Sequence, residues 1–409
     1  MTEVVIVSAC RTPIGSFGGT LRDMHAASIA AVPMKAAIER AGISPEVIDD
    51  VRFGCCLNPT DAMNVTRIAA LMAGIPKSVP AVTINRVCIS GMEATLSGAA
   101  MIQAGLVDIV LSGGVEHMSG VAYTIEKARW GHRMGHGEVT DAMIVGLHCG
   151  SHILPYPQDG PVESFRGKPY IMGHTAEFVA LKFGITRQEQ DEVALRSHNN
   201  VERATKTGAF AAEIVPVPVP QKKGDPKIFE KDEHFRPGLT MEDLARLPPA
   251  FIPKTGTVTA GNSSGINDGA AAMVLMSAER ARSEGIQPLA KIKAVGMGAC
   301  DPTLMGLSPV PAVQNLLKRS GFALGDFELI EINEAFAAQY IGCERELGLN
   351  REITNINGSG IGLGHPVGCT GARIMVSLIH ALRASGKTLG LATLCGGGGV
   401  SMACALEIV

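Results

Sequence analysis

Two stretches of the chain decide its fold: Ser90-Gly-Met-Glu-Ala-Thr-Leu-Ser-Gly-Ala-Ala-Met-Ile-Gln-Ala-Gly105 and Gly371-Ala-Arg-Ile-Met-Val-Ser-Leu-Ile-His-Ala-Leu-Arg-Ala-Ser-Gly386. Each predicts a helix of small and apolar residues that ends at a glycine. A buried apolar strand follows each helix, Val107-Asp-Ile-Val-Leu-Ser-Gly-Gly114 in the first stretch and Thr388-Leu-Gly-Leu-Ala-Thr-Leu394 in the second. The two glycine ends are 281 residues apart, which indicates two copies of one α/β unit.

Another pair of elements repeats at nearly the same offset. The helix end Lys35-Ala-Ala-Ile-Glu-Arg-Ala-Gly42 and the strand Val51-Arg-Phe53 match Asn315-Leu-Leu-Lys-Arg-Ser-Gly321 and Ile330-Glu-Ile332, each shifted by 279 residues. Units of helix, glycine and strand are common in α/β proteins, so chance similarity is the alternative. A nearly constant offset over four elements favours duplication, and we predict an α/β fold of two similar halves.

A different kind of sequence separates the two copies. It has clustered charge, many Pro and His residues and weak periodicity, which is typical of surface loops that carry binding function. It also contains one predicted helix, Thr186–Thr205, and a return strand, Ala271–Met276, follows it. We expect a first half of residues 1–120 and 254–287, an inserted loop region of 121–253 and a second half of 288–409.

Composition and charge exclude several classes of protein. The chain has 409 residues, of which 46% are hydrophobic and 4% aromatic, and a net charge of −3. Nucleic-acid-binding proteins usually have a strong basic excess, so we expect no nucleic-acid partner. No apolar stretch approaches the length of a membrane span, and the N-terminus lacks the pattern of a secretory signal, so we expect no membrane association and a cytoplasmic location.

The ten cysteines are expected to be reduced thiols, as is usual in the cytoplasm. No CxxC pair is present, and we therefore expect no metal site. A cysteine in a protein rich in Ala and Gly is most often a small buried hydrophobic residue. We assign that role to eight of the ten, namely Cys10, Cys55, Cys56, Cys149, Cys300, Cys343, Cys369 and Cys404.

The remaining two cysteines lie at turns where reactive groups gather in sheets of this kind. Cys88 precedes the first small-residue helix, where unpaired N–H groups and the helix dipole favour a thiolate. His365 lies in the matching turn of the second half, so a facing arrangement of the two turns would bring nucleophile and base together. Cys395 follows the last buried strand, and Asn333 follows the strand at 330–332.

Two other interpretations concern the second turn. His365 could be a core histidine, but Pro366 restricts its backbone, which makes that less favourable. The glycine-rich stretch 358–364 could suggest a phosphate cradle, yet it completes neither GxGxxG nor GxxxxGK[ST]. A nucleotide site of the Rossmann or P-loop kind is therefore rejected.

Together these residues resemble the thiolase family, the acetyl-CoA acetyltransferases and 3-ketoacyl-CoA thiolases, over nearly the whole chain. The blocks that carry the resemblance are Arg11-Thr-Pro-Ile-Gly-Ser-Phe-Gly-Gly19, Cys88-Ile-Ser90, Gly113-Gly-Val-Glu-His-Met-Ser119, Gly256-Thr-Val-Thr-Ala-Gly-Asn-Ser-Ser-Gly-Ile-Asn-Asp-Gly-Ala270, Asn333-Glu-Ala-Phe-Ala337, Gly364-His-Pro366 and Cys395-Gly-Gly397. Each block alone is a weak signal, but all occur in the family's order. The resemblance implies a duplicated, five-layered αβαβα fold with an inserted loop domain that contributes to binding coenzyme A (CoA).

The resemblance also implies a role for each reactive residue. Cys88 would carry the acyl group as a thioester intermediate, and His365 would accept its proton. Asn333 would hold a water that completes one oxyanion hole with His365, while the N–H groups of Cys88 and Gly397 would form the other. Cys395 would be the second acid and base. The reaction would be cleavage of a 3-oxoacyl-CoA by CoA, or the reverse condensation, which places the enzyme among the acyltransferases of fatty acid metabolism.

The family's substrate pocket carries over to a set of small and apolar positions. They are Leu247, Ala250, Phe251, Ala260, Gly261, Ser264, Met172, Met305 and Phe336. Lys222 and Lys223 would meet the CoA phosphates, with a solvated charge run as the equal alternative. The resemblance implies no cofactor, since CoA is itself a substrate, and a homodimer or homotetramer, with a second kind of subunit as an alternative.

One departure from the family pattern bears on the substrate. Short-chain members usually have a His where this chain has Ile171, and the preceding stretch 148–170 is longer than usual. Replacing His by Ile adds apolar surface, so we expect an acyl group other than acetoacetyl, such as a longer, branched or aromatic one. The competing functions are a decarboxylating ketoacyl synthase, which needs no second thiol such as Cys395, and a non-catalytic lipid-binding subunit, which needs neither Cys88 nor His365.

Overall fold

A computed structural model describes residues 2–409 of the chain. Its longest strands consist of small and branched apolar residues, as strands that are covered on both faces require. Strands β1 (Val4–Arg11) and β10 (Asn267–Ser277) are buried along their whole length, and they pair antiparallel although more than half of the chain separates them. The last strand of the first half therefore returns beside the first, as predicted.

The main sheet is continuous across the molecule. Its other strands are β2 (Gly15–Ser16), β3 (Asp50–Gly54), β4 (Ala81–Ile84), β5 (Ile109–His117), β11 (Ala290–Ala299), β12 (Leu329–Ile332), β13 (Leu389–Gly396) and β14 (Val400–Ile408). The order is β12-β13-β14-β11-β1-β10-β5-β3-β4, with β2 beside β10. The order β1-β10-β5-β3 of one half repeats as β11-β14-β13-β12 in the other. The two halves are joined by a short pairing of Val5 and Ile6 with Lys291 and Ala290.

Helices cover both faces of each half-sheet. Those of the two halves are α1 (Ala26–Ala41), α2 (Val65–Met72), α3 (Ser90–Gln103), α8 (Ala278–Ser283), α9 (Pro309–Ser320), α10 (Ala337–Leu347), α11 (Gly360–Leu363) and α12 (Val367–Ser385). The predicted glycine ends are confirmed at Gly42, Gly321 and Gly386, each in the left-handed conformation that a helix end favours.

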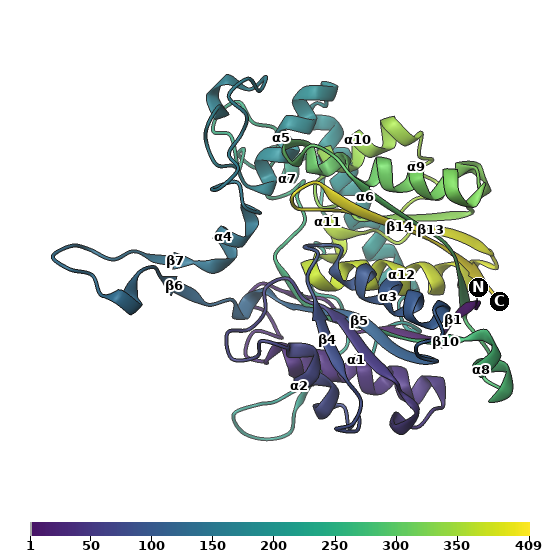
Figure 1. Ribbon diagram of the computed structural model, residues 1–409. Coiled ribbons are helices and arrows are strands. Elements are labelled where there is room, and N and C mark those ends of the chain that lie inside the picture. Colours follow the sequence, from purple (N-terminus) through teal and green to yellow (C-terminus); the bar gives the residue numbers. More distant parts are fainter. Residues whose placement is uncertain (1) are drawn as a thin grey trace.

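Five layers result from this arrangement (Figure 1). Helices α1 and α2 cover the outer face of the first half-sheet, and α9 and α10 cover the outer face of the second. Helices α3 and α12 lie between the two half-sheets and share one core cluster with strands of both, including Met92, Met273, Met375 and Met402. The chain therefore has the thiolase-like αβαβα fold that the resemblance implied.

The two central helices approach each other at glycines. A Cβ on Gly371 of α12 would lie 2.5 Å from the backbone nitrogen of Met92 in α3. A Cβ on Gly91 would lie 2.8 Å from the backbone nitrogen of Ala372. Because no side chain separates the backbones here, the two helix N-termini, and the turns that precede them, are close together.

The inserted region contains more regular structure than the sequence indicates. Its elements are β6 (Tyr123–Ile125), β7 (Val139–Asp141), α4 (Ala142–Leu147), α5 (Met172–Phe183), α6 (Arg187–Thr207), β8 (Val217–Val219), β9 (Lys227–Phe229) and α7 (Met241–Ala245). The predicted helix is α6, which begins after Thr186 in a capping box with Glu189. Helices α5 and α6 pack against the second half, while the β6–β7 hairpin extends away from the body of the molecule (Figure 1).

Candidate active site

Cys88 lies in a tight turn directly before helix α3. Asn85 Oδ1 accepts from the N–H of Val87, and Ser90 Oγ accepts from the N–H of Arg86 and donates to the Val87 carbonyl. Val87 has a φ of 51°, a left-handed conformation that a β-branched residue rarely adopts. These three hydrogen bonds therefore hold the turn in a conformation that Val87 alone would not favour. The turn places Cys88 at the helix N-terminus, as the sequence predicted.

His365 lies in the matching turn before helix α12. Its backbone N–H donates to Asn267 Oδ1 at 2.9 Å, and its Nδ1 lies 2.6 Å from Thr370 Oγ1. The Thr370 hydroxyl donates its own proton to the Pro366 carbonyl at 3.0 Å. Thr370 Oγ1 is therefore the acceptor in its contact with His365, and Nδ1 carries the proton. The other ring nitrogen, Nε2, then carries no proton and can act as a base.

Asn333 and Gly397 lie next to the site, but neither is in the wall of the cavity that Cys88, His365 and Cys395 line. Asn333 is buried at the end of β12, and its Nδ2 lies 3.4 Å from His365 Nδ1. The backbone N–H groups of Gly397, which follows β13, and of Cys88 itself both lower the pKa of the Cys88 thiol. Two backbone N–H groups therefore favour negative charge beside Cys88, where an oxyanion hole for an acyl group on its sulfur would need donors.

The three predicted acid, base and nucleophile side chains line one cavity of about 440 Å³, and its walls are mostly apolar. Cys88, His365 and Cys395 come from the two different halves of the fold. Of the predicted substrate-binding residues, the cavity wall includes Ala250, Phe251, Ala260, Ser264, Met172, Met305 and Phe336. The duplicated fold thus places the turn before α3 and the turn before α12 at the same cavity.

Four predicted substrate-binding residues lie elsewhere. Leu247 and Gly261 pack against each other, since a Cβ on Gly261 would lie 2.5 Å from Leu247 Cδ1, and neither is in the cavity wall. Lys222 is exposed in the loop between β8 and β9, outside the cavity wall, and so is its neighbour Lys223.

Sequence reasoning missed two residues of the cavity wall with ionisable side chains, His234 and Arg236. Both lie in an irregular segment between β9 and α7, where no periodicity or motif marks them. Burial lowers the pKa of His234 to about 4, with the neighbouring Arg236 as the second cause. The wall therefore includes one guanidinium, beside a neutral imidazole at physiological pH.

Burial sets the protonation states of the reactive groups. It raises the pKa of Cys88 to about 12, with Cys149 as the next cause, while the Gly397 N–H lowers that pKa. Burial also raises the pKa of Cys395 well above its ordinary value, with Cys88 as the second cause. Burial, followed by the charge of Arg373, lowers the pKa of His365 to about 3. The resting site therefore holds two neutral thiols and a neutral imidazole.

One cysteine assigned to the core is a neighbour of the site instead. Cys149 is only partly buried, and a Cβ on Gly397 would lie 2.1 Å from its Sγ. It lines a small pocket behind Gly397 together with Tyr170, Ile171 and Met305. Cys56 and Cys300 are also only partly buried, so the core assignment is wrong for these three of the eight and confirmed for the other five.

Comparisons with known proteins cover almost the whole chain. Residues 4–279 match the family model described as "Thiolase, N-terminal domain", and residues 286–408 match "Thiolase, C-terminal domain". An acetyl-CoA acetyltransferase of Cupriavidus necator is 46% identical over 407 residues, which cover all of both chains. The crystal structure of the Bacillus anthracis acetyl-CoA acetyltransferase has a TM-score of 0.93 at 45% identity, covering 100% of this chain and 99% of that one. The crystal structure of human mitochondrial 3-ketoacyl-CoA thiolase has a TM-score of 0.92 at 38% identity, covering 100% of this chain and 99% of that one.

Proposed function

The chain belongs to the thiolase family and is a CoA-dependent acyltransferase, and we propose that Cys88, His365 and Cys395 carry its chemistry, with Asn333 and Gly397 as oxyanion-hole residues. The observation that carries this proposal is the convergence of the three side chains on one cavity. The Gly397 N–H, which lowers the pKa of the Cys88 thiol, adds support. The substrates are CoA thioesters.

In the cleavage direction, Cys88 Sγ attacks the 3-oxo carbon of a 3-oxoacyl-CoA while its proton passes to His365 Nε2. Because the pKa of Cys88 is about 12 and that of His365 about 3, the transfer must accompany the attack rather than precede it. The bond between C2 and C3 then breaks. Its electron pair goes to the acetyl-CoA enolate, which takes a proton from Cys395, and acetyl-CoA leaves an acyl thioester on Cys88.

The second half-reaction transfers the acyl group to CoA. The CoA thiol loses its proton to Cys395 and attacks the thioester, and Cys88 Sγ leaves and regains its proton from His365. In the reverse, condensing direction Cys395 removes a proton from C2 of acetyl-CoA, and the resulting enolate attacks the acyl thioester. Donation from the N–H groups of Cys88 and Gly397 supports the thioester oxyanion in both directions.

We further propose that the CoA arm enters along Ala260, Ser264, Ala250 and Phe251, with Arg236 near its phosphates. Small residues and one aromatic wall fit a thin pantetheine chain. A guanidinium is a strong donor to phosphate, and Arg236 offers it from within the cavity wall, whereas Lys222 lies outside that wall.

The acyl end of the cavity supports an apolar acyl group that is larger than acetyl. Leu147, Ile171, Met172 and Met305 line both the cavity and the small pocket behind Gly397. An aromatic cluster backs this wall, in which the Tyr156 and Phe178 ring centroids are 4.8 Å apart. We propose a longer, branched or aromatic 3-oxoacyl-CoA as the substrate.

Thiolysis kinetics test both proposals. We expect kcat/KM to be higher for a longer or phenyl-substituted 3-oxoacyl-CoA than for acetoacetyl-CoA, and no thiolysis by Cys88→Ala. Each buried methylene contributes about 0.8 kcal/mol, or roughly fourfold in kcat/KM. Ile171→His should shift the ratio toward acetoacetyl-CoA. A clear preference of the unmodified enzyme for acetoacetyl-CoA would overturn the substrate assignment, and thiolysis by Cys88→Ala would overturn the site.

Other features of the protein are proposed on the same basis. We propose two similar halves, residues 1–120 with 254–287 and residues 288–409, with 121–253 inserted and contributing to CoA binding. We also propose that no cofactor is needed besides the substrates, and that the enzyme is a cytoplasmic homodimer or homotetramer. Within residues 2–409, no helix is both long enough and apolar enough to cross a lipid bilayer.

A further inference from the structure

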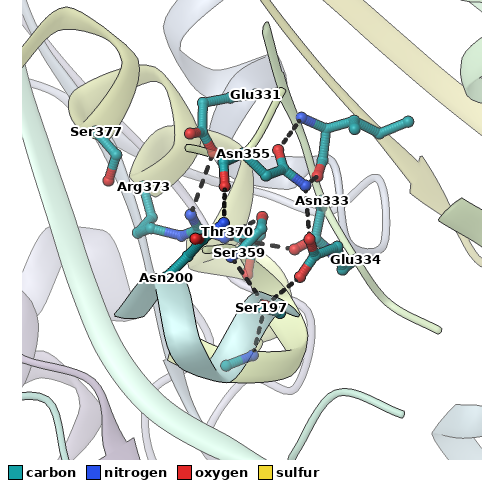
Figure 2. Close-up of polar contacts among 12 residues, drawn as sticks. Ser197, Asn200, Glu331, Asn333, Glu334, Asn355, Ser359, Thr370, Arg373 and Ser377 are labelled. Atoms are coloured by element: carbon teal, nitrogen blue, oxygen red, sulfur yellow. Dashed lines mark hydrogen bonds and ion pairs between the residues drawn. The ribbon is translucent and has the colours of Figure 1, made fainter. Parts of the chain in front are cut away.

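Arg373 is a fully buried cation two contacts away from the reacting atoms. It lies on helix α12, three residues after Thr370, and its exposure is 0%. Figure 2 shows its guanidinium beside Glu331, Asn333 and Ser359. Nη2 lies 3.4 Å from Asn333 Oδ1 and 3.5 Å from Ser359 Oγ, and Nη1 lies 3.9 Å from Glu331 Oε2. All of these contacts are long for a buried charge.

The other fully buried arginine shows the contrast. Arg11 Nε lies 2.6 Å from Glu213, and its Nη1 and Nη2 lie 2.7 and 3.0 Å from the two oxygens of Asp232. Among residues 2–409, Arg373 Nε and Nη1 and Glu331 Oε2 have no hydrogen-bond partner. An incompletely paired buried charge is costly, and a purely structural role would be better served by pairing such as that of Arg11. The position of the Arg373 charge therefore calls for another role.

The hydrogen-bond donors and acceptors of Arg373 and Asn333 indicate that role. A guanidinium only donates hydrogen bonds, so the amide atom of Asn333 that faces Arg373 must be its oxygen. The nitrogen, Nδ2, then faces His365, 3.4 Å from Nδ1. Since Nδ1 carries the proton that it donates to Thr370, this is a contact between two donors, which His365 alone would not favour. Gly360 leaves room for this orientation, since a Cβ there would lie 2.6 Å from Asn333 Oδ1. Without the cation, the amide could turn its oxygen toward His365, where an oxyanion would be repelled.

We propose that Arg373 is a positioning residue of the thiolase reaction, whose buried cation fixes the Asn333 amide with its N–H groups toward the oxyanion site and adds positive charge behind that site. The inference rests on the proposed roles of Asn333 and His365. It deepens them by naming what orients the amide, since Arg373 itself touches neither the cavity nor a substrate.

The protonation states of the neighbours support this inference. Burial raises the pKa of Glu331 to about 8, so its carboxyl is mostly protonated at neutral pH and cancels little of the Arg373 charge. Glu213 also acts on that charge, but its carboxylate is paired with Arg11. The same charge is the second cause, after burial, of the lowered pKa of His365. A neutral imidazole is the form that accepts the Cys88 proton.

A double-mutant cycle of Arg373→Met and Asn333→Ala tests the proposal, with thiolysis of the preferred 3-oxoacyl-CoA as the assay. Loss of one oxyanion-hole donor lowers kcat by roughly 10²–10³-fold, and we expect a fall near ~10²-fold for Arg373→Met with KM for CoA within ~2-fold. In the Asn333→Ala background the same substitution should lower kcat by less than ~3-fold, because the group it acts through is gone. Arg373→Lys, which keeps a cation, should recover at least ~10-fold of the loss.

Several outcomes would overturn the proposal. They are equal losses in both backgrounds, a change confined to KM, or a lysine variant as poor as the methionine one. Should Arg373→Met fail to fold, Glu331→Gln decides: it leaves the cation in place, so kcat within ~3-fold of the unmodified enzyme supports the proposal and a loss of 10-fold or more overturns it.

Two controls separate this inference from the proposed function. Ser377→Ala alters a hydrogen bond to Glu213 one turn along α12 and should leave kcat unchanged. If Asn333→Ala itself keeps full activity, the proposed role of Asn333 fails, and the inference that rests on it fails with it. If Asn333→Ala is impaired and uncoupled from Arg373→Met, only the inference fails.

Discussion

At the scale of single residues, the protein separates its two reactive thiols by what surrounds them. Burial raises the pKa of both thiols, and the N–H groups of Gly397 and of Cys88 itself oppose this rise at Cys88. Cys395 lies near the end of a buried strand, and the neighbouring Cys88 raises its pKa further. We propose that Cys88 loses its proton to His365 as it attacks, whereas Cys395 keeps a proton to give.

Cys395→Ala should therefore affect the two half-reactions differently. We expect Cys88 to be acylated by an acyl-CoA at a rate within ~10-fold of the unmodified enzyme, and C–C bond formation to fall by roughly 10²–10⁴-fold, the range for loss of a general acid or base. Mass spectrometry of the acylated protein and a condensation assay measure the two steps. Equal losses in both would contradict the assigned role.

Thr370 should set the tautomer of His365. Its Oγ1 lies 2.6 Å from Nδ1, and its own proton goes to the Pro366 carbonyl. Thr370→Val keeps the shape but removes the acceptor, so we expect kcat to fall by about 10²-fold with KM within ~3-fold, because a base in the wrong tautomer is ineffective. Thr370→Ser keeps the hydroxyl and serves as the control. A valine variant as active as the serine variant would show that the hydroxyl does not hold the ring.

At the scale of elements, the site depends on the close approach of α3 and α12. Cys88 and His365 precede these helices, and the helices meet where Gly91 and Gly371 carry no side chain. Glu116 also links the two halves, because its buried carboxylate accepts hydrogen bonds from the N–H groups of Cys56 in the first half and Gly368 in α12. The geometry of the proposed catalytic pair is thus set by backbone packing rather than by long side chains.

Gly371→Ala should destabilise the protein by about 2–3 kcal/mol, because the added methyl group must displace the backbone of Met92 and over-packing of a core costs about this much. Urea unfolding at neutral pH measures the change in the free energy of unfolding. Gly325→Ala is the matched control, since its Cβ meets nothing within 4 Å and no change is expected beyond about 0.5 kcal/mol. Equal stability of the two variants would mean that the helices can separate without cost.

The elements also show what sequence patterns could predict. Both halves were predictable because each helix ends at a glycine and each strand is an apolar run, so the offset repeats. Helix α5 was missed because the residue before it, Ile171, has no capping oxygen, and the ring of His174 accepts from the Ile171 N–H instead. Cys88, His365, Cys395 and Asn333 could be proposed as site residues from the sequence, since each lies next to such an element in a marked turn.

The residues that escaped prediction share a physical cause. Arg236 and His234 lie in an irregular segment, and Arg373 lies inside a helix that is buried on all sides along most of its length. Their importance comes from neighbours that are distant in sequence, as with Arg373 and Asn333, 40 residues apart. Neither periodicity nor a local motif carries that information.

At the scale of the whole molecule, several buried histidines make stability depend on pH. Burial lowers the pKa of His198 and of His234 to about 4 and that of His365 to about 3. The unfolded chain, with ordinary values near 6.5, binds more protons below that pH. The contribution of these neutral histidines to the free energy of unfolding is therefore fully present above about pH 6.5. It is lost progressively as pH falls toward 4.

We expect the free energy of unfolding in urea to fall between pH 7 and pH 5, before most carboxylates titrate. His198→Asn keeps an acceptor for the Arg236 N–H that now reaches His198 Nδ1 at 3.2 Å, and it removes one titrating group. Its stability should therefore change less over this range than that of the unmodified protein. Identical slopes for the two proteins would show that His198 does not contribute.

The pairing of β1 with β10 and β11 also has a consequence for folding during synthesis on the ribosome. A ribosome completes residue 11 of β1 long before it reaches residue 267, where β10 begins. At 5–20 residues per second this interval is roughly 13–50 s. During it an apolar strand that is fully covered in the finished enzyme lies unpaired outside the exit tunnel. A nascent chain of this kind needs protection from its neighbours on a polysome, and slower translation would lengthen the period of risk.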